Sequence, residues 1–222
     1  MTRVLVLRPE PGASATVKRS RERGLDAVAL PLFEIEPVAW EAPQARGFDG
    51  LLLTSANAVR CGGERLKDLR ALPVYAVGEA TAQAARDAGF DVAATGDGGV
   101  DRLLGSINPE LRLLHLAGAD RMIPGNARQE IVSIAVYRAK PADGVYLGVA
   151  ANSIALIHSP RAARRFAELM APDKASVTIA AISGDAAEAA GAGWARVEVA
   201  EAANDEALVA LTERLCNKVA AR

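Results

Sequence analysis

Short apolar runs alternate with polar, alanine-rich stretches along this chain. Residues 4–7 are all apolar, which is typical of a strand buried on both faces. Strands that alternate with helices predict an α/β fold of doubly wound parallel sheets, with helices on both faces. Such runs predict strands at 3–8, 50–54, 74–77, 92–94, 111–117, 133–139, 156–158, 178–182 and 196–199, with an extended segment at 27–35 that Pro31 makes irregular.

The intervening stretches predict helices, and several of them carry end signals. Gly24 suits the C′ position of the first helix, and Asn204 or Asp205 suits the N-cap of the last. The predicted helices are at 14–24, 55–69, 79–88, 100–107, 160–170, 185–190 and 204–221, with a loop at 117–127 that could hold a short helical turn and a partly helical stretch at 145–151.

The second half of the chain repeats the first at a nearly constant offset. A period of about a hundred residues indicates a tandem duplication of an α/β unit and two domains, not a solenoid. The matched segments are 29–37 with 133–141 and 54–55 with 158–159, both at an offset of 104, and 77–85 with 182–190 at an offset of 105.

The repeat pairs two strand ends that carry small hydroxyl residues. Thr54-Ser55-Ala56 follows one predicted strand, and Ser159-Pro160 follows its counterpart. Each serine could simply cap the next helix, with Pro160 at the favoured N1 position. The free backbone N–H groups of the first helical turn could instead bind a carboxylate, and both roles are compatible.

A second pair of strand ends lies at Gly78 and at Ser183-Gly184. Gly78 allows close approach of a ligand to the backbone, and Thr81 could either cap the helix or contact a ligand. Ser183 and Gly184 are the repeat partners of this turn.

Two larger side chains are further candidates. Arg8 follows the first strand, where a guanidinium could bind a carboxylate in bidentate fashion or form an exposed ion pair. Tyr137 lies on a predicted strand at the position that Phe33 holds in the first repeat. Its ring could pack in the core with a satisfied hydroxyl, or its hydroxyl could act in a site.

Composition excludes several classes of protein. The 222 residues are 50% hydrophobic with a net charge of −1. The sequence contains no Lys/Arg-rich block of the kind that would predict nucleic-acid binding. No apolar run is long enough for a signal core or a membrane span, so we expect a cytoplasmic location. Cys61 and Cys216 are expected to be reduced thiols, and with His115 and His158 they have no metal-site spacing.

An ordered set of motifs resembles uroporphyrinogen-III synthase over nearly the whole chain. The set consists of VLVLRP (4–9), TSANAV (54–59), VYAVGEATA (74–82), VYR (136–138), SPRAA (159–163) and IAAIS (179–183). The resemblance implies two doubly wound, flavodoxin-like domains joined by a two-stranded linker. Residues 1–36 with 141–222 would form one domain and 37–140 the other.

Members of this family convert hydroxymethylbilane, a linear tetrapyrrole with eight carboxylates, to uroporphyrinogen III. The resemblance implies ring closure with loss of water and inversion of the last ring, through an azafulvene cation and a spiro intermediate, without a cofactor. It also implies a monomer in transient contact with the preceding deaminase. Tyr137 would assist departure of the hydroxyl, and the substrate would contact Arg8, Thr54, Ser55, Ala56, Gly78, Thr81, Ser159, Pro160, Ser183 and Gly184.

One turn departs from the family pattern. Many relatives have a Gly-Pro-Thr-Thr-like turn where this chain has Ser183-Gly184-Asp185-Ala186, so two threonine hydroxyls are missing. Asp185 is an unexpected neighbour for a polyanion, and we expect it to serve as an N-cap. Two other hypotheses stay open: a non-catalytic two-lobed binding module for a small anion, and a nucleotide- or flavin-dependent enzyme, which the lack of a Gly-rich phosphate loop disfavours.

Overall fold

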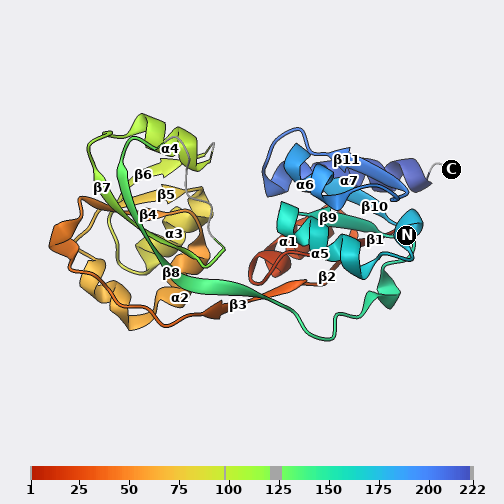
Figure 1. Cartoon of the computed structure of the whole chain (residues 1–222). Coiled ribbons are helices and arrows are strands. Elements are labelled where there is room, and N and C mark those ends of the chain that lie inside the picture. The colour runs from red at the N-terminus through yellow and green to blue at the C-terminus, as the bar shows by residue number, and fades with distance from the viewer. Residues whose placement is uncertain (1, 98, 121–126, 221–222) are drawn as a thin grey trace. The chain divides into compact units, whose positions relative to one another are not determined.

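The computed structural model of this chain describes residues 2–97, 99–120 and 127–220. The chain divides into two compact units, one of residues 1–34 with 141–222 and the other of residues 35–140. Each unit contains a largely parallel sheet between layers of helices (Figure 1). The predicted α/β class is therefore confirmed.

Unit 1 is built on a five-stranded sheet in the order β11-β10-β9-β1-β2, and every neighbouring pair is parallel. Counted along the chain, this order is 2-1-3-4-5, which is the flavodoxin-like arrangement. The strands are β1 (Arg3–Val6), β2 (Asp26–Ala29), β9 (Ile154–Ile157), β10 (Thr178–Ala181) and β11 (Arg196–Val199).

Four helices cover the two faces of this sheet. Val4 and Val6 of β1 pack into one core cluster with residues of α1 and α7. Leu5 alternates with them and is also fully buried, and α5 and α6 pack against each other and against β9 and β10. The helices are α1 (Gly12–Glu22), α5 (Pro160–Leu169), α6 (Gly184–Ala190) and α7 (Asp205–Ala220).

Unit 2 holds a six-stranded sheet in the order β3-β8-β7-β4-β5-β6. The five strands from β8 to β6 are parallel. β3 runs antiparallel to β8, because Val38 N–H donates to the Val136 carbonyl while Ala142 N–H donates to the Leu32 carbonyl. The strands are β3 (Phe33–Pro37), β4 (Gly50–Leu53), β5 (Val74–Val77), β6 (Val92–Gly96), β7 (Arg112–Gly118) and β8 (Glu130–Pro141).

Three helices complete the described part of unit 2: α2 (Ala56–Gly62), α3 (Glu79–Asp87) and α4 (Val100–Ser106). Leu51 and Leu53 of β4 face a cluster that includes residues of α2 and α3. Leu52 points the other way and packs on Leu103 and Leu104 of α4. The sheet is therefore covered on both faces, as the unbroken apolar run of β4 predicts.

The two sheets share one strand order but mix the two sequence repeats. When β7 and β8 are counted first, the order β8-β7-β4-β5-β6 is also 2-1-3-4-5. β4, β5 and β6 begin 104 residues before β9, β10 and β11, respectively. Apart from β3, each sheet thus joins three strands of one repeat to two strands of the other, which periodicity alone does not reveal.

Some predicted elements differ from the structure. The extended segment at 27–35 is two strands, β2 and β3, separated around Pro31. The helix predicted at 55–69 ends at Gly62 and continues as a 3₁₀ helix over 63–69, since Gly63 has φ of +66°. Part of the loop predicted at 117–127 lies outside the described residues, and the partly helical stretch at 145–151 is a short 3₁₀ helix at Leu147–Val149.

The capping predictions were mostly correct. The side chains of Ser55 and Ser159 accept hydrogen bonds from Asn57 N–H and Ala162 N–H, both at 3.2 Å, and Asn204 caps α7. The expected capping role of Asp185 was wrong. Ser183 is the N-cap and accepts from Ala186 N–H at 3.3 Å, so Asp185 lies in the first turn of α6.

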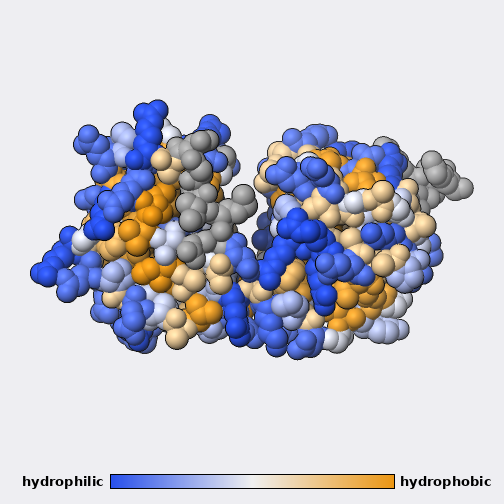
Figure 2. Space-filling model, viewed as in Figure 1, coloured by the Kyte–Doolittle hydropathy of each residue, from blue (hydrophilic) through white to orange (hydrophobic). Residues whose placement is uncertain are grey.

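The surface shows no single dominant apolar face in the view of Figure 2, where hydrophilic and hydrophobic residues are interspersed on both units. Tyr146, Val197 and Val199 are the large hydrophobic residues exposed in the described part of the chain. Scattered exposed hydrophobics are normal on globular proteins, so they do not by themselves mark an interaction surface.

Candidate functional site

In unit 1, three predicted site residues meet at one edge of the sheet. Arg8, Ser159 and Ser183 each follow the end of a strand by two residues, after β1, β9 and β10. These strands are adjacent and parallel, so their carboxyl ends lie at the same edge. We call this set of residues, with the contacts described below, the unit 1 edge.

The unit 1 edge lies at the topological switch point of its sheet. β1 connects through α1 to β2 on one side, whereas its neighbour β9 connects through α5 to β10 on the other. Chains that leave adjacent strands in opposite directions open a crevice at the carboxyl ends, where α/β sheets usually bind ligands.

An ion-pair cluster surrounds Arg8 at this edge. Asp205, the first residue of α7, accepts hydrogen bonds from Thr16 Oγ1 at 2.8 Å and from Arg19 Nη1, and lies 3.6 Å from Arg8 Nη1. A Cβ atom at Gly12 would lie 2.5 Å from Arg8 Nε, so the guanidinium rests on the start of α1. Arg8 therefore forms an ion pair, as one of its two alternatives predicted. Its 3.6 Å distance to Asp205 is longer than that of a close salt bridge.

Burial and the Arg19 guanidinium lower the pKa of Arg8. One carboxylate faces two guanidinium groups here, so the cluster keeps a net positive charge. A partly desolvated cation without a close counter-charge of its own suits an anionic ligand.

His158 is buried in the same cluster. Its Nε2 lies 2.8 Å from Asp205 Oδ1, and its side chain is only 8% exposed. Burial, followed by the charge of Arg8, lowers the pKa of His158 to about 3. His158 is therefore neutral at physiological pH, and its Nε2–H can donate to Asp205.

The remaining predicted residues of unit 1 contribute mainly backbone. Pro160 opens α5 after the Ser159 cap, as predicted. A Cβ atom at Gly184 would meet nothing within 4 Å, so a ligand could approach the main chain there.

In unit 2, the equivalent edge contains Thr54, Ser55 and Gly78. Thr54 and Ser55 follow β4, and Gly78 follows β5, which is the parallel neighbour of β4. The switch point lies between β4 and β7. We call this set the unit 2 edge, and it carries no charged side chain among the predicted residues.

Three of the predicted site residues in unit 2 offer little side chain to a ligand. Ala56 is 9% exposed and begins α2, so only its backbone is available. Gly78 has φ of +80°, and a Cβ atom there would meet nothing within 4 Å. Thr81 is 5% exposed, and the N-cap position of α3 is Gly78, with no side-chain cap. Capping by Thr81 is thus not observed, and its contact with a ligand stays a prediction.

Thr54 has a buried partner that the sequence interpretation missed. Thr54 Oγ1 lies 3.0 Å from Nε2 of His115, and Nδ1 of the same ring lies 3.2 Å from Ser133 Oγ. From the sequence, His115 was weighed only as a metal ligand. No sequence signal links it to Thr54, because the two residues meet through the pairing of β7 with β4, which are far apart in the chain.

Tyr137 lies on β8, where the register of the sheet shifts by one residue. Ala117 pairs with Ala135, but Gly118 pairs with Tyr137. The ring lies directly over Gly118, because a Cβ atom there would be 2.9 Å from Cε2 and 3.2 Å from the hydroxyl oxygen. The ring also packs against the core cluster of unit 2, which agrees with the packing alternative.

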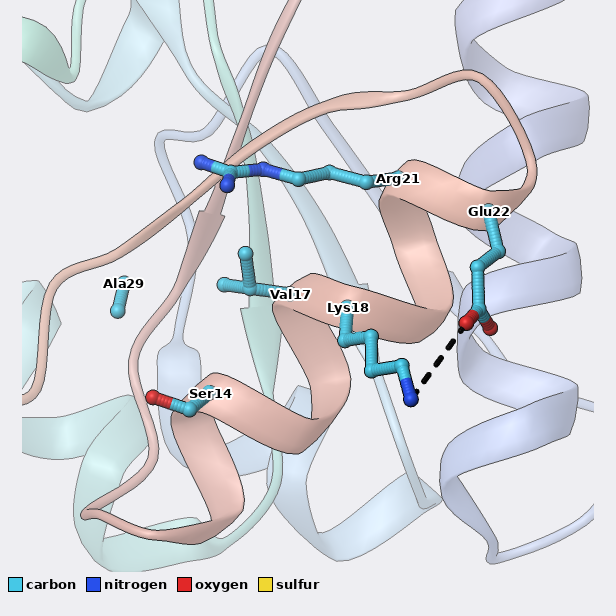
Figure 3. A pocket seen from close by; sticks show the side chains of 6 residues that line it. All are labelled: Ser14, Val17, Lys18, Arg21, Glu22 and Ala29. Atoms are coloured by element: carbon cyan, nitrogen blue, oxygen red, sulfur yellow. Dashed lines mark ion pairs between the residues drawn. The ribbon is translucent and has the colours of Figure 1, made fainter.

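A cavity of about 610 Å³ lies along α1 and β2 of unit 1 (Figure 3). Val17 and Ala29 line it, and Lys18 pairs with Glu22 at 3.9 Å on the helix. None of the predicted site residues lines it, and it is not part of the candidate site.

Other classes of site find no support in the described residues. No group of three or more His, Cys, Asp or Glu side chains is placed to hold a metal ion. Burial raises the pKa of both the Cys61 and Cys216 thiols, so neither is an activated nucleophile. Within the ranges that the structure describes, no helix is long and apolar enough to cross a membrane.

Comparisons with known proteins identify the family. The family model described as Uroporphyrinogen-III synthase HemD matches residues 14–210. The chain belongs to the uroporphyrinogen-III synthase family. The resemblance predicted from the sequence motifs is thereby confirmed.

Curated relatives of the uroporphyrinogen-III synthase family match over shorter segments. A uroporphyrinogen-III synthase from Chlorobaculum parvum is 37% identical over 92 residues, which cover 37% of this chain and 37% of that protein. A putative uroporphyrinogen-III synthase from Archaeoglobus fulgidus is 36% identical over 81 residues, or 36% of this chain and 34% of that protein. The aligned segments thus span about a third of each of these relatives.

Solved structures of uroporphyrinogen-III synthases share the fold over the whole chain. The enzyme from Helicobacter pylori covers 97% of this chain and 100% of its own, with 19% identity and a TM-score of 0.68. A mutant enzyme from the extremely thermophilic bacterium Thermus thermophilus covers 98% and 100%, with 20% identity and a TM-score of 0.56. At this identity the likeness supports the fold alone.

Proposed function

We propose that this protein is a uroporphyrinogen-III synthase that closes hydroxymethylbilane to uroporphyrinogen III with loss of water and inversion of the last ring. The family match over residues 14–210 is the observation that carries this proposal. The geometry of the two edges supports it, since each sheet offers serine or threonine hydroxyls and helix starts at a switch point.

The binding role is assigned to both edges, and the substrate's eight carboxylates are the groups they bind. In unit 1, Arg8 supplies a positive charge, and the turn at Ser183 and Gly184 supplies backbone N–H groups. In unit 2, Thr54 and Ser55 supply hydroxyls. The other residues in the binding role are Ala56, Gly78, Thr81, Ser159 and Pro160. We propose that the two compact units are the two domains predicted from the sequence.

Tyr137 is the proposed catalytic residue. Its hydroxyl transfers its proton to the hydroxyl that leaves the bilane, so that the C–O bond breaks, water departs, and a cationic azafulvene and a tyrosinate remain. The proton that the new macrocycle loses after ring closure returns to the tyrosinate. The placement of Tyr137 over Gly118 supports this role, because the missing side chain at Gly118 leaves the phenol room at the carboxyl edge of β7. The protein's further task is to hold the bilane so that attack at the substituted carbon of the last ring outruns direct closure.

The proposal includes a monomeric enzyme in the cytoplasm, in transient contact with the deaminase that supplies its unstable substrate. Analytical ultracentrifugation of the purified chain, alone and with that deaminase, measures both the oligomeric state and the contact. A stable dimer at micromolar concentration would overturn the monomer.

The product isomer tests the function directly. Hydroxymethylbilane is generated in situ by a deaminase, and the type I and type III products are separated after oxidation. The expected result is type III product in proportion to added protein. Type I product alone at every protein concentration would show that the chain is not a synthase. If the bilane still bound with measurable affinity in that case, the protein would be a non-catalytic binding module instead.

A further inference from the structure

His115 occupies the strand next to Thr54, on the same face of the unit 2 sheet. Leu52 of β4 pairs with His115 of β7, which in turn pairs with Ser133 of β8. Thr54 lies two residues beyond Leu52, so its side chain shares the face of Leu52 and His115. The register therefore aligns three polar side chains across three strands.

These side chains form a continuous hydrogen-bonded series. His115 is 1% exposed, with Nε2 at 3.0 Å from Thr54 Oγ1 and Nδ1 at 3.2 Å from Ser133 Oγ. Thr54 and Ser133 are both half-buried, but only Thr54 follows the carboxyl end of its strand, so its hydroxyl is the end of the series that lies at the proposed binding edge. Leucine could fill the same packing role on these apolar strands. The buried imidazole therefore points to a role for its ring nitrogens.

We propose that His115 is a positioning residue that holds the Thr54 hydroxyl as a hydrogen-bond donor to a substrate carboxylate. This rests on the proposed function of the edge. A carboxylate only accepts hydrogen bonds, and a hydroxyl has one proton to donate. If Thr54 gave that proton to His115, none would remain for the substrate.

The imidazole must therefore donate to Thr54 through Nε2–H, while its Nδ1 accepts from the Ser133 hydroxyl. Every donor in the series Ser133, His115, Thr54 then points toward the edge. In such an ordered series, each hydrogen bond polarises the next one, which strengthens the Thr54 hydroxyl as the last donor. It also fixes the rotation of the Thr54 hydroxyl before the substrate arrives.

The protonation of the ring tests this arrangement without any substrate. Long-range 1H–15N correlation spectra of histidine-labelled protein distinguish a protonated Nε2 from a protonated Nδ1. The chain has only two histidines, so the spectrum of a His158→Gln variant assigns the signals. We expect the Nε2–H form for His115. An Nδ1–H form would overturn the proposal even if the protein makes type III product.

Two variants test the consequence for the substrate. His115→Gln keeps a side-chain N–H that can donate to Thr54, whereas His115→Leu fills the space without a donor. We expect His115→Leu to raise KM about tenfold with little change in kcat, as for a lost hydrogen bond to a charged group, and His115→Gln to stay close to wild type. Equal KM values in the leucine variant and wild type would refute the positioning role.

Ser133→Ala keeps the test decisive if His115→Leu does not fold, as judged by circular dichroism and melting. Removing the Ser133 hydroxyl takes away the donor to Nδ1, so we expect a larger Nδ1–H fraction and a raised KM. No change in either would contradict the ordered series. Failure of the proposed function has a different signature, which is the absence of type III product with wild-type protein.

Discussion

The two sheet edges have the same topology but opposite chemistry. At the unit 1 edge, Asp205 joins Arg8, Arg19 and buried His158 in a charged cluster. At the unit 2 edge, Thr54 contacts His115 in a neutral series of hydrogen bonds. The repeat pairs His158 with Thr54, and both follow the strand at the switch point of their own sheet, so the duplication kept the position of the edge while the side chains there diverged.

This difference separates two ways of binding a carboxylate. A guanidinium provides long-range attraction and tolerates many orientations, whereas a fixed hydroxyl provides one directional hydrogen bond. We therefore expect the unit 1 edge to contribute electrostatic affinity and the stability of its unit, and the unit 2 edge to contribute one directional contact to a carboxylate.

Removing the charge of Asp205 should give the largest effect on stability. Asp205→Asn keeps the shape but leaves Arg19 and Arg8 without their shared carboxylate. The Asp205 side chain is 17% exposed, so we expect a loss of about 3 kcal/mol in the free energy of unfolding, near the lower end for a broken buried ion pair. Urea denaturation at pH 7 measures it.

Glu206→Gln is the matched control for Asp205→Asn. Glu206 is the next residue of α7 and pairs with Arg23, but its side chain is 76% exposed. We expect a change below about 0.5 kcal/mol. Equal losses in the two variants would mean that the cluster around Asp205 has no special role.

Tyr137→Phe should give the largest effect on turnover. The variant removes one oxygen atom and keeps the ring that packs on Gly118, so the stability of unit 2 should not change. We expect kcat to fall about 100-fold with little change in KM, as for the loss of a positioned acid. The rate of type III formation from in situ bilane measures this.

Tyr75→Phe is a suitable control, because this second tyrosine of unit 2 lies on β5 and packs against the cluster beside α4. An unchanged kcat in Tyr137→Phe, in protein of wild-type melting temperature, would remove Tyr137 from the mechanism.

Much of this comparison was accessible from the sequence. The repeat matched residues 54–55 with 158–159 at an offset of 104, which is also the offset between the starts of β4, β5 and β6 and those of β9, β10 and β11. The apolar runs predicted most of the strands. The serine caps at 55 and 159 were predicted because capping is local chemistry. The division of the fold into two units that mix the repeats came only with the family resemblance, because strand pairing is a long-range property.

The parts that the sequence did not predict depend on contacts between distant residues. Asp205 looked like a helix cap, yet it joins Thr16 across 189 positions of the chain. The bulge that brings Tyr137 opposite Gly118 has no sequence signature. The cap of α6 moved from Asp185 to Ser183 because the strand before it ends at Ala181, which shifts the start of the helix by one residue relative to the expectation.

The pH dependence of stability should distinguish the two edges. The pKa of His158 is about 3 in the folded protein against 6.5 in the unfolded chain, so unfolding takes up a proton below pH 6.5. Stability from this group is fully present above pH 6.5 and is lost as the pH falls toward 3. Between pH 7 and pH 5 we expect a loss of about 2 kcal/mol.

His158→Gln should remove this dependence, because the amide does not titrate and can still donate to Asp205. Urea denaturation of both proteins at pH 7, 6 and 5 gives the comparison. Parallel curves for wild type and variant would show that the buried histidine does not contribute to acid sensitivity.

Arg8→Gln should give the smallest effect, and it concerns binding. Glutamine keeps a polar side chain but has no charge, so we expect KM for the bilane to rise about tenfold while kcat stays near wild type. Because the 3.6 Å pair with Asp205 is long, unfolding should change by less than about 1 kcal/mol. Arg3→Gln, at an exposed pair with Asp26 at the start of β1, is the matched control for a lost arginine. A fall in kcat with KM unchanged in Arg8→Gln would assign Arg8 to the chemical step and contradict a binding role for the unit 1 edge.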